Sequence, residues 1–274
     1  MMDEVIRKPA VAGSFYPKNR EILLNVISEL MEKTNTKKLF ENIFGVIAPH
    51  AGYIYSGYTA AYAYNALRNK KFDTAIIISP SHREYFHGVS IYNGDYFSTP
   101  LGNIPINKNI AKIIAENSAS IFLGEVGHGA EHAVEVQLPF LQFVNPDLKI
   151  VPIVIGDQRK NFVYELADRI VSCYSEDLVL IASSDLSHFY PKETAAILDK
   201  KVQERILNFE YDELLTDLEK NECEACGGGP IVSVIKAASS LGYTNLEILS
   251  KTDSGDFSGD NTSVVGYLSA VIYK

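Results

Sequence analysis

Short apolar runs rich in β-branched residues recur along the chain, and segments whose apolar residues repeat at helical spacing separate them. Because near-continuous Ile and Val runs that alternate with helices are typical of a parallel sheet covered on both faces, this pattern predicts an α/β fold. We expect a mainly parallel or mixed central sheet flanked by helices. The expected strands lie at 43–48, 73–79, 148–155, 178–183, 245–250 and 263–272, with shorter ones within 85–105. The expected helices lie at 18–33, 56–69 with Ser56 as N-cap, 107–117, 131–143, 160–174, 192–208, 211–220 and 229–240.

One domain spanning residues 1–274 is the simplest organisation. The chain is 46% hydrophobic and 22% charged, which is ordinary for a globular protein with a substantial core. No linker, low-complexity tract or fixed-period repeat divides it.

Charge and composition argue against several classes of protein. A net charge of −9 and a pI near 5.2 argue against a general nucleic-acid binder, which would carry a basic footprint. No apolar run is long enough to cross a bilayer, and the N-terminus begins with Met1-Met2-Asp3-Glu4 instead of a secretory segment. Three cysteines do not make a disulfide framework. These features predict a cytoplasmic protein.

Three of the predicted strands end in residues that can bind a metal or move a proton. His50 follows the run at 43–48, His82 follows 73–79, and Asp185 with His188 follows 178–183. In open α/β sheets the loops at the carboxyl ends of the strands gather along one edge and build the ligand crevice. We therefore expect these distant residues to share one pocket.

His50 and His82 are the leading candidates for metal ligands. Each lies beside a proline that stiffens the turn, and neutral imidazole is a common ligand for iron, zinc or copper. Either histidine alone is more typical of a loop residue satisfied by hydrogen bonds. The pair at matching strand ends favours a metal site.

Cys226 is the candidate for a third ligand. It precedes three glycines and Pro230, which mark a helix start, and the positive end of a helix is expected to lower the pKa of the thiol. Cys223 and Cys226 also form a Cys-x-x-Cys pair, which leaves a redox-disulfide role as an alternative. A small buried residue in a tight turn is the structural alternative.

Three further residues are candidates for proton transfer. His188 can act as a general acid or base, and Asp185, three residues earlier, can orient a histidine. His132 lies four residues after His128 but lacks the glutamate of a His-Glu-x-x-His motif. We expect His132 just inside a helix start, facing the pocket.

Several motifs together resemble the Memo family, which is called AmmeMemoRadiSam system protein B in archaea and bacteria. They are RKPAVAGSFYP at 7–17, PHAGYIYSG at 49–57, SPSH at 79–82, EHAVEVQLPF at 131–140, SSDLSH at 183–188, CGGGP at 226–230 and GD at 255–256. The resemblance runs almost from end to end of the chain.

This resemblance implies a fold similar to that of class III extradiol dioxygenases, with a cysteine in place of the carboxylate that helps to bind their iron. It implies His50, His82 and Cys226 as metal ligands, with Asp185, His188 and His132 lining the pocket. It implies iron or copper as the metal, and zinc could substitute because imidazole and thiolate also suit it. The system name implies association with radical-SAM and AMMECR-type proteins.

Three functions are compatible with these residues. The first is a metal-dependent redox enzyme that acts on a small molecule or on O₂. The second is a non-catalytic protein that uses the same crevice to hold a peptide or a metal for a partner. The third is a metal-dependent hydrolase, against which Cys226 counts because hydrolases usually use histidine and carboxylate ligands.

Overall fold

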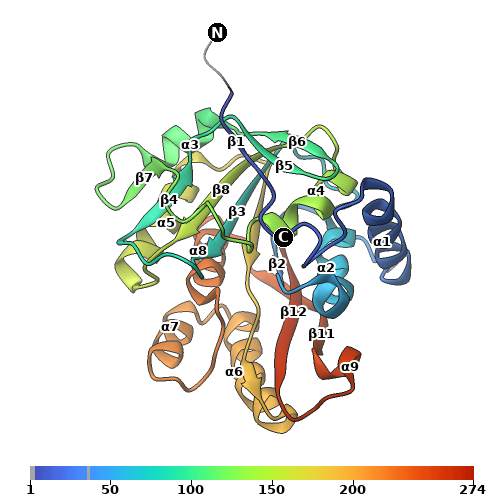
Figure 1. The fold of residues 1–274 in the computed structure, drawn as a ribbon. Helices are drawn as coiled ribbons and strands as arrows, with labels where there is room; N and C mark the ends of the chain where they lie inside the picture. Colours follow the sequence, from blue (N-terminus) through green and yellow to red (C-terminus); the bar gives the residue numbers. More distant parts are fainter. Residues whose placement is uncertain (1–3, 36–37) are drawn as a thin grey trace.

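The computed structural model describes residues 4–35 and 38–274, so Met1–Asp3 of the acidic start lie outside it. Its main element is a nine-stranded sheet (Figure 1). In spatial order, eight of its strands are β10 (His188–Tyr190), β12 (Val264–Tyr273), β2 (Ile43–Ala48), β9 (Leu178–Ser183), β3 (Thr74–Pro80), β8 (Lys149–Ile155), β4 (Val89–Tyr92) and β7 (Ile121–Gly124). The ninth, β11 (Asn245–Asp253), pairs with β12.

The sheet is parallel at its centre and mixed at its margins. Neighbours among β2, β9, β3 and β8 are all parallel, whereas β12 is antiparallel to β2 and β4 is antiparallel to β8. The four central strands therefore end along one edge. The predicted α/β architecture with a mainly parallel or mixed sheet is confirmed.

Helices cover both faces of the sheet (Figure 1). One face packs against α1 (Arg20–Lys33), α2 (Tyr53–Leu67) and α4 (Leu138–Val144). The other packs against α3 (Lys108–Ala115), α5 (Lys160–Cys173), α6 (Lys192–Leu207), α7 (Tyr211–Glu219) and α8 (Gly228–Ser240). The short helix α9 (Gly255–Ser258) follows β11.

Successive residues of the central strands supply the two cores. On β3, Ile76 and Ile78 join one apolar cluster, whereas Ala75 and Ile77 join the other. This alternation follows from the period of two in a strand, and it explains why a strand buried on both faces carries a continuous apolar run, as at residues 75–78 of β3. Among the described residues, no helix is long and apolar enough to cross a membrane.

A smaller sheet lies beside the main one. It contains β1 (Ile6–Arg7), β5 (Tyr96–Thr99) and β6 (Gly102–Pro105), with β1 parallel to β5 and β5 antiparallel to β6. The pairing of β1 brings the N-terminal lead-in across the molecule toward the segment that precedes α4. Arg7 thereby reaches the loop that carries a histidine of the candidate site.

Two predicted helix starts are wrong. The helix expected from 131 begins later, as η1 (Glu135–Gln137) followed by α4, so His132 lies in a loop. The reason is local, because the Glu131 carboxylate accepts hydrogen bonds from the backbone N–H groups of His132 and Ala133. The other helix, α2, begins at Tyr53 with Gly52 as its N-cap, and the Ser56 hydroxyl lies inside it, donating to Ala51 O.

Candidate metal centre

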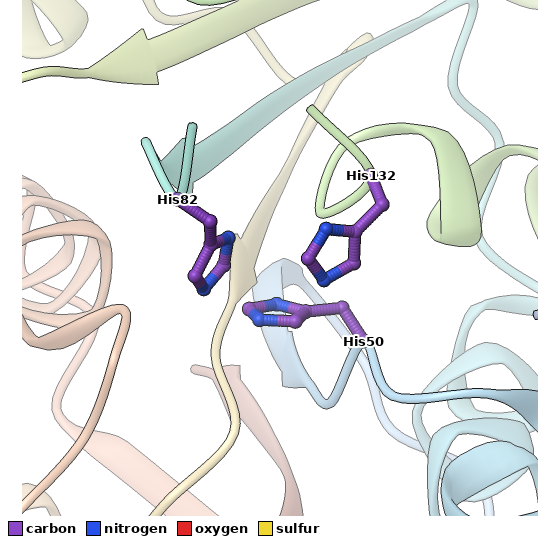
Figure 2. Close-up of side chains that lie close together, drawn as sticks. All are labelled: His50, His82 and His132. Atoms are coloured by element: carbon purple, nitrogen blue, oxygen red, sulfur yellow. The ribbon is translucent and has the colours of Figure 1, made fainter. Parts of the chain in front are cut away.

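Three histidine rings converge at the carboxyl edge of the central sheet (Figure 2). His50 follows β2, His82 follows β3, and His132 enters from the loop before η1. The ring centroids are 5.1 Å apart for His50 and His82, 5.4 Å for His50 and His132, and 4.7 Å for His82 and His132. One nitrogen of each ring lies within 4.8 Å of the others, so this histidine cluster could hold a metal ion.

His50 is the buried member of the histidine cluster. Its backbone N–H donates to Asp185 Oδ1 at 2.7 Å, and its Nδ1 lies 2.9 Å from Ser183 Oγ. Burial, with smaller contributions from His82 and His132, holds the pKa of His50 well below its usual value. The ring is therefore neutral at physiological pH, as a metal ligand must be.

His82 is the member that solvent can reach, with 28% of its side chain exposed. Glu131 holds it at two points, accepting from the backbone N–H at 2.6 Å and lying 2.9 Å from Nδ1. Burial alone would raise the pKa of Glu131, but the hydrogen bonds and attraction from His82 lower it to about 2. An ionised carboxylate can only accept, so His82 Nδ1 carries a hydrogen and Nε2 is the ring nitrogen available to a metal.

His132 belongs to the histidine cluster, although the sequence placed it among the pocket-lining residues. Its ring packs against Phe15 at 4.8 Å between centroids. Its buried Nδ1 has no hydrogen-bond partner among the described residues and lies 3.4 Å from Glu131 Oε1. Burial lowers the pKa of His132 to about 4 against the opposing effect of Glu131, so this ring is also neutral.

Cys226 lies beside His50. Its Sγ is 3.2 Å from His50 Nε2 and accepts the backbone N–H of Asp185, also at 3.2 Å. The prediction that the start of α8 lowers the thiol pKa is wrong, because burial raises the pKa of Cys226. Without a cation the sulfur is a thiol, and a bound metal would displace its proton. The role of Cys226 as a ligand stays a prediction.

Cys223 and Cys173 are free, as is Cys226, and burial raises the pKa of Cys223 to about 11.

Asp185 and His188 line a cavity of about 500 Å³ that reaches the histidine cluster at His132. Burial raises the pKa of Asp185 to about 6, and its Oδ2 lies 4.0 Å from His50 Nε2. The His188 ring keeps 27% of its surface exposed and lies 3.4 Å from Glu224 Oε1. Both residues are thus positioned to face a bound molecule, and their roles in proton transfer stay predictions.

The structure also shows residues to which the sequence analysis gave no role. Glu131 orients His82, and Glu135 accepts hydrogen bonds from Arg7, the Tyr16 hydroxyl and two backbone N–H groups of the lead-in. Both glutamates lie in the quoted motif at 131–140, which is one sequence signal. A carboxylate inside an apolar segment, as in EVQLPF, is the kind of feature that could have indicated a buried partner.

The donor set fits a transition metal. It consists of three imidazoles with a thiol beside one of them, and Nδ1 of His50 and Nδ1 of His82 each already have a hydrogen-bond partner. Such second partners orient metal-binding histidines in known sites. Neutral imidazole with sulfur suits iron, copper or zinc rather than magnesium or calcium.

The neutral buried histidines predict a loss of stability in acid. In the unfolded chain histidine titrates near 6.5, whereas burial lowers the pKa of His132 to about 4 and that of His128 to about 3. The unfolded state therefore binds more protons below pH 6.5, and the stability present above that pH is lost progressively as the pH falls through about 4. We expect urea unfolding of the metal-free protein to show a loss of about 2 kcal/mol per histidine between pH 6.5 and 5. His132→Gln should make the free energy of unfolding fall less steeply with decreasing pH. An unchanged pH dependence would contradict the lowered pKa of His132.

The fold and the site define an α/β protein with a histidine cluster at the carboxyl edge of a mixed sheet. Residues 7–271 match the family model described as Memo-like protein. The chain therefore belongs to the Memo-like protein family, which confirms the resemblance carried by the motifs.

Full-length relatives agree with this assignment. A MEMO1 family protein of Thermoplasma volcanium is 38% identical over 268 residues, covering 97% of this chain and 98% of the relative. Another, from Methanosarcina barkeri, is 36% identical over 271 residues, covering 97% and 100%. In fold, the chain is similar to the crystal structure of an uncharacterized protein of Escherichia coli K12, with a TM-score of 0.56 and 14% identity over 84% of this chain and 99% of that one.

Proposed function

We propose that this protein binds iron or copper at the histidine cluster and uses it in a redox reaction on a small molecule or peptide. The observation that carries the proposal is the convergence of three imidazoles, with one nitrogen of each within 4.8 Å of the others, at the edge of the sheet. His50, His82 and His132 would hold the ion, and Cys226 would add a thiolate from beside His50. Zinc could occupy the same donors.

The position of His132 favours a ligand role over the proton-transfer role that the sequence predicted. A proton-transfer group needs access to substrate, whereas a ligand must reach the ion together with the other donors. One nitrogen of His132 lies within 4.8 Å of a nitrogen of His50 and of His82, and its buried Nδ1 has no hydrogen-bond partner within the part of the chain that the structure describes. His188, on the cavity wall, remains the candidate acid or base, and Asp185 orients the backbone of His50.

When bound, iron or copper would supply one-electron chemistry toward O₂ or an oxidisable substrate, as in the class III extradiol dioxygenases that the family resembles. The cavity would hold the substrate between His132, Asp185 and His188. We further propose radical-SAM and AMMECR-type proteins as partners, on the family resemblance alone. The contact of Cys226 with His50 weighs against the hydrolase alternative.

A second candidate function is non-catalytic binding of a peptide in the same cavity. Two side chains on its wall, Ile54 and Phe189, are each 74% exposed. Phe189 also adopts a left-handed backbone conformation with φ 64°, which is costly for an aromatic residue and typical of functional sites. Exposed apolar side chains around a cavity favour the docking of an apolar segment.

Metal analysis followed by X-ray absorption spectroscopy tests the proposal. We expect protein purified without added metal to contain about one iron or copper ion per chain, with nitrogen scatterers at about 2.0–2.1 Å and one sulfur at about 2.3 Å. A spectrum without sulfur would exclude Cys226 as a ligand and leave the three histidines. Protein that retains no metal and binds none on titration would contradict the proposed function.

A further inference from the structure

We propose that Ser183 is a positioning residue whose hydroxyl holds His50 in the tautomer that carries its hydrogen on Nδ1. This tautomer leaves the lone pair of His50 Nε2 free for a metal. Its use in metal binding rests on the proposed function, but the tautomer is a property of the metal-free chain. The hydrogen bonds around Ser183 Oγ determine which nitrogen of His50 carries the hydrogen.

A backbone carbonyl takes the single hydrogen of the Ser183 hydroxyl. Ser183 Oγ lies 2.7 Å from Ala133 O, and a carbonyl oxygen can only accept. The hydroxyl therefore donates to Ala133, and Oγ has only its lone pairs left for its other two neighbours. Those neighbours are Gln137 Nε2 at 2.7 Å and His50 Nδ1 at 2.9 Å.

A second carbonyl sets the orientation of the Gln137 amide. Gln137 Nε2 lies 3.0 Å from Pro49 O, so the amide must present its NH₂ group there, because the flipped amide would oppose two acceptors. In this orientation Gln137 Oε1 accepts from the Tyr64 hydroxyl. The second hydrogen of the NH₂ group then points to Ser183 Oγ, which accepts it.

His50 Nδ1 must consequently donate to Ser183. The hydroxyl donates its hydrogen to Ala133 O. An unprotonated His50 Nδ1 would therefore face the lone pairs of Ser183 Oγ, with no hydrogen between the two atoms. A neutral imidazole carries one hydrogen only. Nε2 is left unprotonated, 3.2 Å from Cys226 Sγ, where the thiol S–H can donate to it.

The surroundings leave these groups little freedom. Ser183, Gln137 and Tyr64 have no exposed surface, and His50 is 1% exposed. Ser183 ends β9 and is paired in register with Ala48, the last residue of β2, two residues before His50. A buried and rigid acceptor of this kind is what fixes the tautomer in known metal sites.

Nitrogen NMR of the metal-free protein, with ¹⁵N-labelled histidine and long-range ¹H–¹⁵N correlation, tests the tautomer directly. We expect His50 to show a protonated Nδ1 and an unprotonated Nε2, and Ser183→Ala to move the population toward protonated Nε2. A wild-type His50 with hydrogen on Nε2, or on both nitrogens, would overturn the inference. The wild-type spectrum tests the tautomer even if Ser183→Ala does not fold.

Metal titration provides the functional readout. By calorimetry with Zn²⁺ as the probe, Ser183→Ala should weaken binding about 10–100-fold, as loss of a hydrogen-bond partner behind a ligand does. Ser183→Thr keeps the hydroxyl and should restore both the tautomer and the affinity. Ser233→Ala is the matched control, because Ser233 is equally buried but donates to Val163 O between α8 and α5.

The two proposals fail in different ways. Unchanged tautomer and unchanged Zn²⁺ affinity in Ser183→Ala would overturn the role of Ser183 while leaving the metal site intact. A wild-type protein that shows the expected tautomer but binds no metal would support the inference about Ser183 and contradict the proposed function.

Discussion

Replacement of Arg7 with alanine is expected to lower the free energy of unfolding by about 3–5 kcal/mol, because it leaves a buried carboxylate without its cation. The side chains of Arg7 and Glu135 are 5% and 0% exposed and form an ion pair. Arg7 Nε also donates to His128 O at 3.0 Å, and the guanidinium lies 5.1 Å from the centre of the Phe97 ring. The substitution therefore removes an ion pair, a hydrogen bond and packing at once.

The effect should extend to the lead-in and to the loop that carries His132. Glu135 accepts from the backbone N–H groups of Ala10 and Val11 at 2.8 and 3.0 Å, and Arg7 also donates to Glu131 O. Loss of Arg7 removes the contacts of its side chain with Glu135 and with Glu131 O. We therefore expect faster amide exchange in residues 5–17 and 127–136.

Urea unfolding followed by circular dichroism measures the change. Lys160→Ala is the control, because Lys160 and Asp212 form an exposed ion pair whose loss should have a much smaller effect. Equal midpoints for Arg7→Ala and Lys160→Ala would show that the buried pair does not stabilise the fold.

His50→Ala is expected to weaken metal binding more than about 100-fold, because it removes a ligand rather than a residue behind one. His82→Ala should have a comparable effect, since both rings belong to the histidine cluster. Metal content after purification and Zn²⁺ titration measure the loss. His87→Ala is the matched control, because the His87 side chain is 74% exposed and pairs with Asp157 instead.

Cys226→Ser separates the contribution of the thiol from that of the imidazoles. If Cys226 binds the metal, the variant should lose affinity and any sulfur-to-metal charge-transfer band, while its fold stays intact. Stoichiometric metal in both His50→Ala and Cys226→Ser would contradict the ligand assignment.

The sequence predicted the strands more reliably than the start of one critical helix. Runs such as 75–78 and 178–182 are apolar at every position, which is typical of a strand buried on both faces. The helix expected from 131 had the right period but the wrong start, because the Glu131 side chain competes for the first N–H groups. Such a competition is invisible until the position of the side chain is known.

The sequence by itself determined that His50 and His82 each follow a buried strand of an α/β sheet, because the apolar runs and the helical segments between them are local patterns. Only the tertiary structure decided that His132 joins them and that Cys226 lies against His50. It also decided that Glu131 lies within hydrogen-bond distance of the His82 ring and Ser183 within hydrogen-bond distance of the His50 ring. These contacts join residues roughly 50 to 180 positions apart, and no periodicity within a strand or helix encodes a distance across such a separation.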